Sequence, residues 1–129
     1  MEFTMKENSF VTELEFGQLE VSGNAEYGFR PYQLLVSSIA VCSGGVLRKV
    51  LDKKRIGYKD IKIKTDVKRN EAEINEVTDI HIHFVIVGTD ATDEKIAKVL
   101  EITTKNCPIV QSVKESIRIT ETFERIGNE

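Results

Sequence analysis

The segment from Pro31 to Arg55 constrains the fold more than any other part of the 129-residue chain. It contains the longest apolar run, from Leu34 to Cys42, in which every residue is apolar or small. A helix of this composition has no polar stripe, so we expect it to be buried on all sides. The run is broken by serines and is shorter than the roughly 20 residues that span a bilayer, so we expect no membrane segment.

Length and composition are typical of a single globular domain, which we assign to residues 1–129. The chain is 40% hydrophobic and 30% charged, and it is long enough to form a core without disulfides or metals. Its first ten residues contain no basic stretch followed by an apolar one, so we expect a cytoplasmic protein without a secretory signal. In that reducing compartment a cysteine pair is reactive or simply buried rather than a permanent disulfide.

Charge is unevenly distributed, although the net charge is only −3. Residues 30–70 contain eleven bases and three acids, a local charge of +8. Such a segment can meet an acidic partner or nucleic acid. We favour a cationic helix end followed by the solvent face of a strand, because the basic part, residues 48–69, has one aromatic residue and no nucleic-acid-binding motif.

Periodicity predicts the other elements. Alternating residues with a turn at Gly17-Gln18 predict a hairpin over 9–23, and a short edge strand is expected within 1–6. Further strands are predicted at 58–69, 76–88 and 117–123. Thr92 is a predicted N-cap for the helix that follows, and a second helical piece is expected after Cys107-Pro108. The central helix should end around Lys54–Gly57, with a basic last turn and a glycine stop. This order predicts an α+β domain with a mostly antiparallel sheet.

Cys42 and Cys107 are the candidate reactive residues. They are 65 residues apart and outside any CxxC pair, so their spacing predicts neither a thioredoxin-like motif nor a zinc site. Each is either a small core residue or a nucleophile. Cys107 stands at a helix start, where the dipole favours a thiolate. Cys42 has no such help and needs a cation, for which Arg30 is the nearest candidate, about three turns away along a helix.

Two other local features have alternative explanations. Gly44 and Gly45 follow Cys42 closely, and glycines in mid-helix cost on the order of 1 kcal/mol each relative to alanine. They indicate either close helix packing or room for a substrate beside the thiol. His81 and His83 alternate along one strand and share its polar face. With a thiol they could bind zinc, but surface histidines are the commoner case, and we expect no metal.

The segment from Arg30 to Leu35 (RPYQLL), continuing to Ala40–Gly45 (AVCSGG), resembles the central helix of the OsmC/Ohr family. Later segments match the family's second half in order and spacing: Ile80–Phe84, Asn106–Pro108, Ser112-Val113 and Ile117–Thr120. The resemblance covers nearly the whole chain and is strongest to the OsmC-like branch. It implies the OsmC-like fold, with a long buried central helix, and an intertwined homodimer with the thiols at or near the subunit interface.

The same resemblance implies a thiol-dependent peroxidase that acts on organic or hydrogen peroxide and protects against oxidative stress. Cys42 would become a sulfenic acid, Cys107 would condense with it to form a disulfide, and a dithiol reductant would reopen the bond. No cofactor is implied. Arg30 would be a catalytic cation, and Tyr32, Gln33, Gly44 and Gly45 would line the substrate pocket or the interface.

The sequence departs from the family at the start of this helix. Tyr32 and Gln33 stand where family enzymes place an activating glutamate, and no arginine precedes Arg30. A non-catalytic OsmC-like protein that binds a small molecule or a partner is therefore the alternative.

Overall fold

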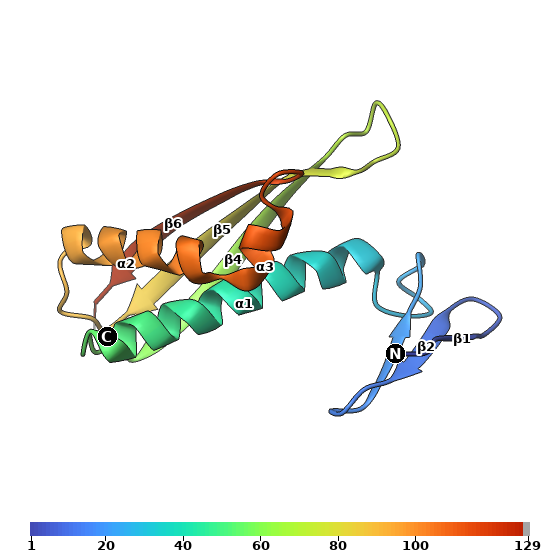
Figure 1. Cartoon of the computed structure of the whole chain (residues 1–129), viewed down its shortest axis with the longest axis horizontal. Helices are drawn as coiled ribbons and strands as arrows, with labels where there is room; N and C mark the ends of the chain where they lie inside the picture. The colour runs from blue at the N-terminus through green and yellow to red at the C-terminus, as the bar shows by residue number, and fades with distance from the viewer. Residues whose placement is uncertain (128–129) are drawn as a thin grey trace. The chain divides into compact units, whose positions relative to one another are not determined.

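The computed structural model describes residues 1–127 (Figure 1). The chain divides into two compact units, Met1–Ser37 and Ser38–Glu129. Helix α1 (Pro31–Lys53) begins in the first unit and continues into the second. The assignment of residues 1–129 to a single domain stays a prediction.

The N-terminal unit is a small antiparallel sheet of β1 (Thr4–Met5), β2 (Phe10–Glu13) and β3 (Gln18–Val21). The β2–β3 turn is closed by two backbone hydrogen bonds between Leu14 and Gly17, of 3.0 and 3.1 Å. Both the predicted hairpin and the predicted edge strand are therefore confirmed.

The C-terminal unit is a three-stranded sheet covered on one face by helices (Figure 1). Its strands are β4 (Asp60–Arg69), β5 (Val77–Val87) and β6 (Arg118–Ile126), and its further helices are α2 (Asp93–Asn106) and α3 (Pro108–Val113). β4 and β5 are antiparallel, whereas β5 and β6 are parallel. Parallel neighbours require a crossover connection, which α2 and α3 provide. The predicted α+β class, mostly antiparallel with a long central helix, is confirmed.

The core of this unit lies between the sheet and the helices. Four alternate residues of β5 are fully buried, and they are Ile80, Ile82, Phe84 and Ile86. Leu47 and Leu51 from α1 and Ile96 and Val99 from α2 are buried with them. Burial of each such side chain contributes about 1.5–3 kcal/mol, so this layer fixes the positions of α1 and α2 on the sheet.

Helix α1 is not buried on all sides within a single chain, contrary to expectation. Ile39 and Leu47 are fully buried, but Val41 is 66% exposed. At 23 residues, with a mean hydropathy of 1.6 over its most apolar window, the complete helix is long and apolar enough to span a membrane, although the apolar run considered alone was not. Core helices of soluble proteins meet the same criterion, and α1 contributes to a core.

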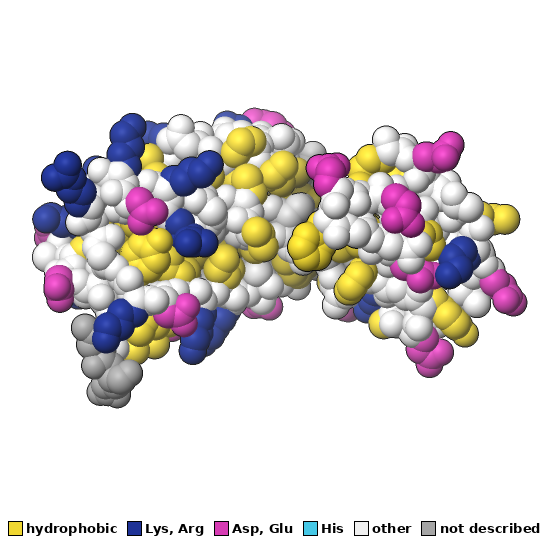
Figure 2. Space-filling model, turned by 90° about the horizontal axis from the view of Figure 1, so that it is seen from below, with side chains coloured by type: hydrophobic (Ala, Val, Ile, Leu, Met, Phe, Trp, Pro, Cys, Tyr) yellow, Lys and Arg dark blue, Asp and Glu magenta, His cyan; other side chains and the backbone are white. Residues whose placement is uncertain are grey.

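The basic segment runs along the end of α1 and the solvent face of β4, as expected. Lys53, Lys54 and Lys62 are all exposed. Figure 2 shows Lys and Arg side chains gathered around the end of the C-terminal unit.

Helix α1 ends one residue before the predicted range of Lys54–Gly57 and has the predicted basic last turn, but the predicted glycine stop is wrong. The helix ends at Lys53, and Arg55 adopts the left-handed conformation with φ 59°. The residue after Arg55 then caps the last turn of the helix, because the Ile56 amide donates a hydrogen bond to the Leu51 carbonyl at 2.9 Å. This left-handed conformation lowers the folding free energy gained by a non-glycine residue by about 1 kcal/mol relative to glycine.

We therefore expect Arg55→Gly to raise the free energy of unfolding by about 0.5–1 kcal/mol, since glycine adopts positive φ without strain. Denaturant unfolding of the variant measures this change. Lys54→Gly is the control, because Lys54 has no positive φ and should gain nothing. A loss of stability in Arg55→Gly would contradict this account of the helix end.

Candidate thiol site

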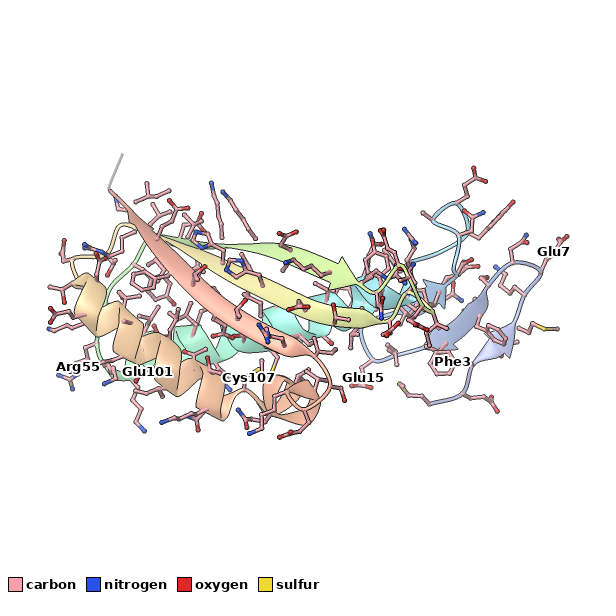
Figure 3. The ribbon with its side chains drawn as sticks, turned by 90° about the horizontal axis from the view of Figure 1, so that it is seen from above. Phe3, Glu7, Glu15, Arg55, Glu101 and Cys107 are labelled. Carbon is pink, nitrogen blue, oxygen red and sulfur yellow. The ribbon has the colours of Figure 1, made fainter. Side chains whose placement is uncertain are left out.

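The structure brings Cys42 and Cys107 together across 65 residues of sequence. Cys42 lies in the middle of α1, and Cys107 is the N-cap of α3, at the junction with α2. Figure 3 shows Cys107 on the side of the sheet that carries the helices. The two thiols are neighbours, close enough for Cys42 to raise the pKa of the Cys107 thiol, and both are free. Proximity of this kind is a first requirement for a disulfide, which also needs Cα atoms about 4.4–6.8 Å apart.

The two thiols differ in environment. Cys42 is partly exposed, whereas Cys107 is fully buried. Burial raises the pKa of the Cys107 thiol to about 11, and contact with Cys42 raises it further, against the lowering effect of the Val110 and Ile109 backbone amides. The helix start alone would favour a thiolate at Cys107, but burial outweighs that effect. The α3 helix has only six residues, and its amides do not compensate for burial.

A thiol with a raised pKa should be alkylated late. We expect iodoacetamide at pH 8 to modify Cys42 first and to leave Cys107 unmodified until the protein unfolds or the pH approaches 11, because only the thiolate reacts. Peptide mass spectrometry after timed alkylation measures both sites. Equal rates in the native protein, with Cys107 already modified at pH 8, would contradict the burial argument.

The raised pKa of Cys107 also makes the free energy of unfolding depend on pH. The pKa of Cys107 in the folded chain lies above the value of about 8.5 for an unfolded cysteine. Folding therefore holds this proton more tightly, so the stabilisation is fully present below about pH 8.5 and is lost as the pH rises through about 11. A Cys107→Ala variant should lack this alkaline component in its unfolding free energy.

A carboxylate that the sequence analysis missed lies between the helices that carry the thiols. Glu121 is on β6, on the inward face that also presents Ile119 and Phe123, and its register partner is Ile82. Ser43, which follows Cys42, donates a hydrogen bond from Oγ to Glu121 Oε2 at 2.6 Å. Thr104, on α2, donates from Oγ1 to Glu121 Oε1 at 2.9 Å. The sequence does contain a signal that could have identified Glu121, because it is a charged residue at an inward position of a strand with alternating apolar residues.

The paired glycines have different surroundings. A Cβ on Gly44 would lie 2.6 Å from Ile63 Cδ1, so Gly44 permits close packing of α1 on β4. A Cβ on Gly45 would meet nothing within 4 Å in this chain. Only Gly44 is thus explained by packing within the described chain.

The start of α1 carries no acidic residue in its first turn. The Arg30 guanidinium lies 4.8 Å from the centre of the Tyr32 ring, a cation–π contact. Gln33 is exposed, and the Gln33 amide bonds the Arg30 carbonyl at 3.1 Å. These three residues belong to the N-terminal unit, whereas both thiols belong to the C-terminal unit.

His81 and His83 share one face of β5, as predicted, and both contact one hydroxyl. His81 Nε2 and His83 Nδ1 each lie 2.7 Å from Thr122 Oγ1, and His83 Nε2 lies 3.0 Å from Glu124 Oε1. This face is opposite the one that packs on the helices. Within residues 1–127, no group of three His, Cys, Asp or Glu side chains is arranged to hold a metal ion.

Comparison with known proteins gives the family. The family model described as OsmC-like protein matches residues 22–122, so the chain belongs to the OsmC-like family. Protein YhfA of Escherichia coli strain K12 is 24% identical over 112 residues, covering 85% of this chain and 84% of YhfA.

Solved structures share the fold over nearly the whole chain. A hypothetical protein from Aquifex aeolicus VF5 is 28% identical with a TM-score of 0.86, covering 99% of this chain and 96% of that one. An organic hydroperoxide resistance protein from Elizabethkingia anophelis is 18% identical with a TM-score of 0.76, covering 96% and 93%. The predicted OsmC-like fold is confirmed.

Proposed function

We propose that the protein is a thiol-dependent peroxidase that reduces organic or hydrogen peroxides through Cys42 and Cys107. The observation that carries the proposal is the contact between these two thiols in a chain of the OsmC-like family. A partly exposed thiol next to a buried one suits successive roles, the first in attack on the substrate and the second in resolution.

The proposed reaction has three steps. The Cys42 thiolate attacks one peroxide oxygen, the O–O bond breaks, and the other oxygen leaves as an alcohol or water after taking a proton. Cys42 is then a sulfenic acid. Cys107 attacks the Cys42 sulfur, the S–OH bond breaks, and the hydroxide leaves as water with the Cys107 proton. A dithiol reductant then reopens the Cys42–Cys107 disulfide by exchange and becomes a disulfide itself.

The raised pKa of Cys107 fits the resolving role. At neutral pH this residue is a protonated thiol, so it does not compete with Cys42 for peroxide. It reacts once a sulfenic acid stands beside it, since proximity raises the effective concentration of the attacking group. The resolving thiol thereby limits further oxidation of Cys42.

The proposal includes a homodimer in the cytoplasm. The exposed Val41 and the unoccupied space beside Gly45 lie on the α1 face that a second copy would cover. Arg30 precedes Cys42 by twelve residues, which span about 18 Å in a helix, so we take Arg30 of a second copy as the candidate cation. Tyr32 and Gln33 would then line the interface or the substrate pocket.

Steady-state peroxide reduction with a dithiol such as dihydrolipoamide tests the proposal. We expect saturable consumption of an organic hydroperoxide, one dithiol being oxidised for each peroxide reduced. A glutathione-only reaction is the control, because a monothiol must form a mixed disulfide before a second molecule completes the exchange. No consumption above the protein-free rate would contradict the proposal.

A non-catalytic binding protein is the second candidate. The absence of an acidic residue in the first turn of α1 favours it, because the family carboxylate that would help activate the thiol is missing there. This candidate predicts that peroxide oxidises Cys42 no faster than a free cysteine. Rapid turnover with a dithiol would exclude it.

A further inference from the structure

We propose that Glu121 is a positioning residue that holds α1 and α2 at the separation at which Cys42 and Cys107 meet. The purpose of this contact rests on the proposed peroxidase function, but the contact itself can be measured without peroxide.

Glu121 occupies a position where an apolar residue would be expected. Its neighbours on the inward face of β6 are Ile119 and Phe123, and it lies beside Ile82 of β5. A carboxylate placed against a core costs free energy unless hydrogen bonds satisfy it. A well-packed hydrophobic residue in such a place is often neutral or stabilising. Stability alone therefore does not account for a glutamate here.

Its two oxygens are held by hydroxyls from two different helices. Ser43 on α1 is fully buried, and its Oγ lies 2.6 Å from Glu121 Oε2. Thr104 Oγ1 on α2 lies 2.9 Å from Glu121 Oε1. The same hydroxyl also lies 3.0 Å from the Leu100 carbonyl oxygen, so its proton is shared between the two acceptors. Hydrogen bonds to a charged acceptor are short and about twice as strong as neutral ones. Glu121 is thus a direct link between α1 and α2.

Both links lie next to a thiol in the chain. Ser43 follows Cys42, and Thr104 precedes Cys107 by three residues. The Thr104 carbonyl also accepts a hydrogen bond from Gln111 Nε2 of α3 at 2.9 Å, which joins the segments on both sides of Cys107. A disulfide requires Cα atoms about 4.4–6.8 Å apart, so a displacement of an ångström or two between α1 and the α2–α3 junction would impair its formation.

The test is the equilibrium of the Cys42–Cys107 disulfide with dithiothreitol, in which the protein gains two thiols as dithiothreitol becomes a cyclic disulfide. It is measured on the full chain by quantitative alkylation, together with the unfolding free energy of the reduced protein. We expect Glu121→Leu to shift the equilibrium at least tenfold toward the dithiol form while the reduced protein stays as stable as the wild type. Glu121→Gln, whose amide can still bond both hydroxyls, should stay within about threefold of the wild type.

Two further variants keep the test decisive if Glu121→Leu does not fold. Thr104→Val removes one hydroxyl at nearly constant shape and should give an intermediate shift toward the dithiol. Glu101→Gln, on the exposed side of α2, is the matched control and should change nothing (Figure 3). Wild-type disulfide equilibria in Glu121→Leu and Thr104→Val would overturn the proposal. It would also be overturned if each shift toward the dithiol form were accompanied by an equal loss in the unfolding free energy of the reduced protein.

The two proposals fail separately. If the wild-type disulfide forms with oxidised dithiothreitol and depends on Glu121, but the protein consumes no peroxide, the positioning role stands and the peroxidase does not. If peroxide turnover is rapid and the disulfide is indifferent to Glu121, the peroxidase stands and the positioning role is overturned.

Discussion

Cys42→Ser is expected to reduce peroxide consumption to the protein-free rate, because a serine hydroxyl at neutral pH is not a nucleophile toward peroxide oxygen. Cys107→Ser should behave differently. It should consume one peroxide per chain in a single turnover, form the Cys42 sulfenic acid, and then accumulate sulfinic acid with excess peroxide. Peroxide assays and intact mass measure both variants.

Ser112→Ala is the control for these substitutions. Ser112 is exposed on α3 and its hydroxyl bonds only the Pro108 carbonyl, at 2.8 Å, so the variant should retain wild-type turnover. Wild-type turnover in Cys42→Ser would instead exclude Cys42 as the attacking thiol. Wild-type turnover without over-oxidation in Cys107→Ser would exclude Cys107 as the resolving one.

Val41→Glu is expected to convert a dimer to monomers. Val41 is 66% exposed in the single chain, so within that chain the substitution should change stability by no more than about 0.5 kcal/mol. On a buried interface between two α1 helices the same carboxylate would be desolvated without a partner, which costs several kcal/mol. Sedimentation velocity at a series of concentrations measures the change.

Ile74→Glu is the matched control, since Ile74 is 87% exposed in the turn between β4 and β5. It should leave the sedimentation coefficient unchanged. Gly45→Ala adds a second comparison, because its Cβ meets nothing in this chain and should favour the isolated helix by about 1 kcal/mol. A monomeric wild-type protein, or a dimer unaffected by Val41→Glu, would contradict the interface.

The sequence predicted the order of the elements because apolar periodicity and N-cap chemistry act locally. Thr92 is the N-cap of α2, and its side chain accepts a hydrogen bond from the Lys95 amide at 3.3 Å. The parallel pairing of β5 with β6 was not predicted, because it depends on the route of the α2–α3 connection. The end of α1 was predicted to within one residue, but the expected glycine stop was wrong, because Arg55 takes the left-handed conformation there.

The thiols of the candidate site could be identified from the sequence, but their surroundings could not. Cys42 and Cys107 were identified from their sequence contexts, and the structure places them in contact. The dipole argument for Cys107 failed because sequence does not give the depth of burial, which raises its pKa. Glu121 was visible in principle, since it interrupts the apolar face of residues 117–123. Its partners Ser43 and Thr104 are 78 and 17 residues away and become neighbours only in the fold.

The most direct test of the thiol mechanism is peptide mass spectrometry of the reduced protein after one equivalent of an organic hydroperoxide. The mechanism predicts loss of two thiols per chain and a cross-linked peptide that joins Cys42 to Cys107, at a rate well above that of free cysteine. Two free thiols after complete mixing, or a disulfide that joins Cys42 to anything other than Cys107, would contradict it.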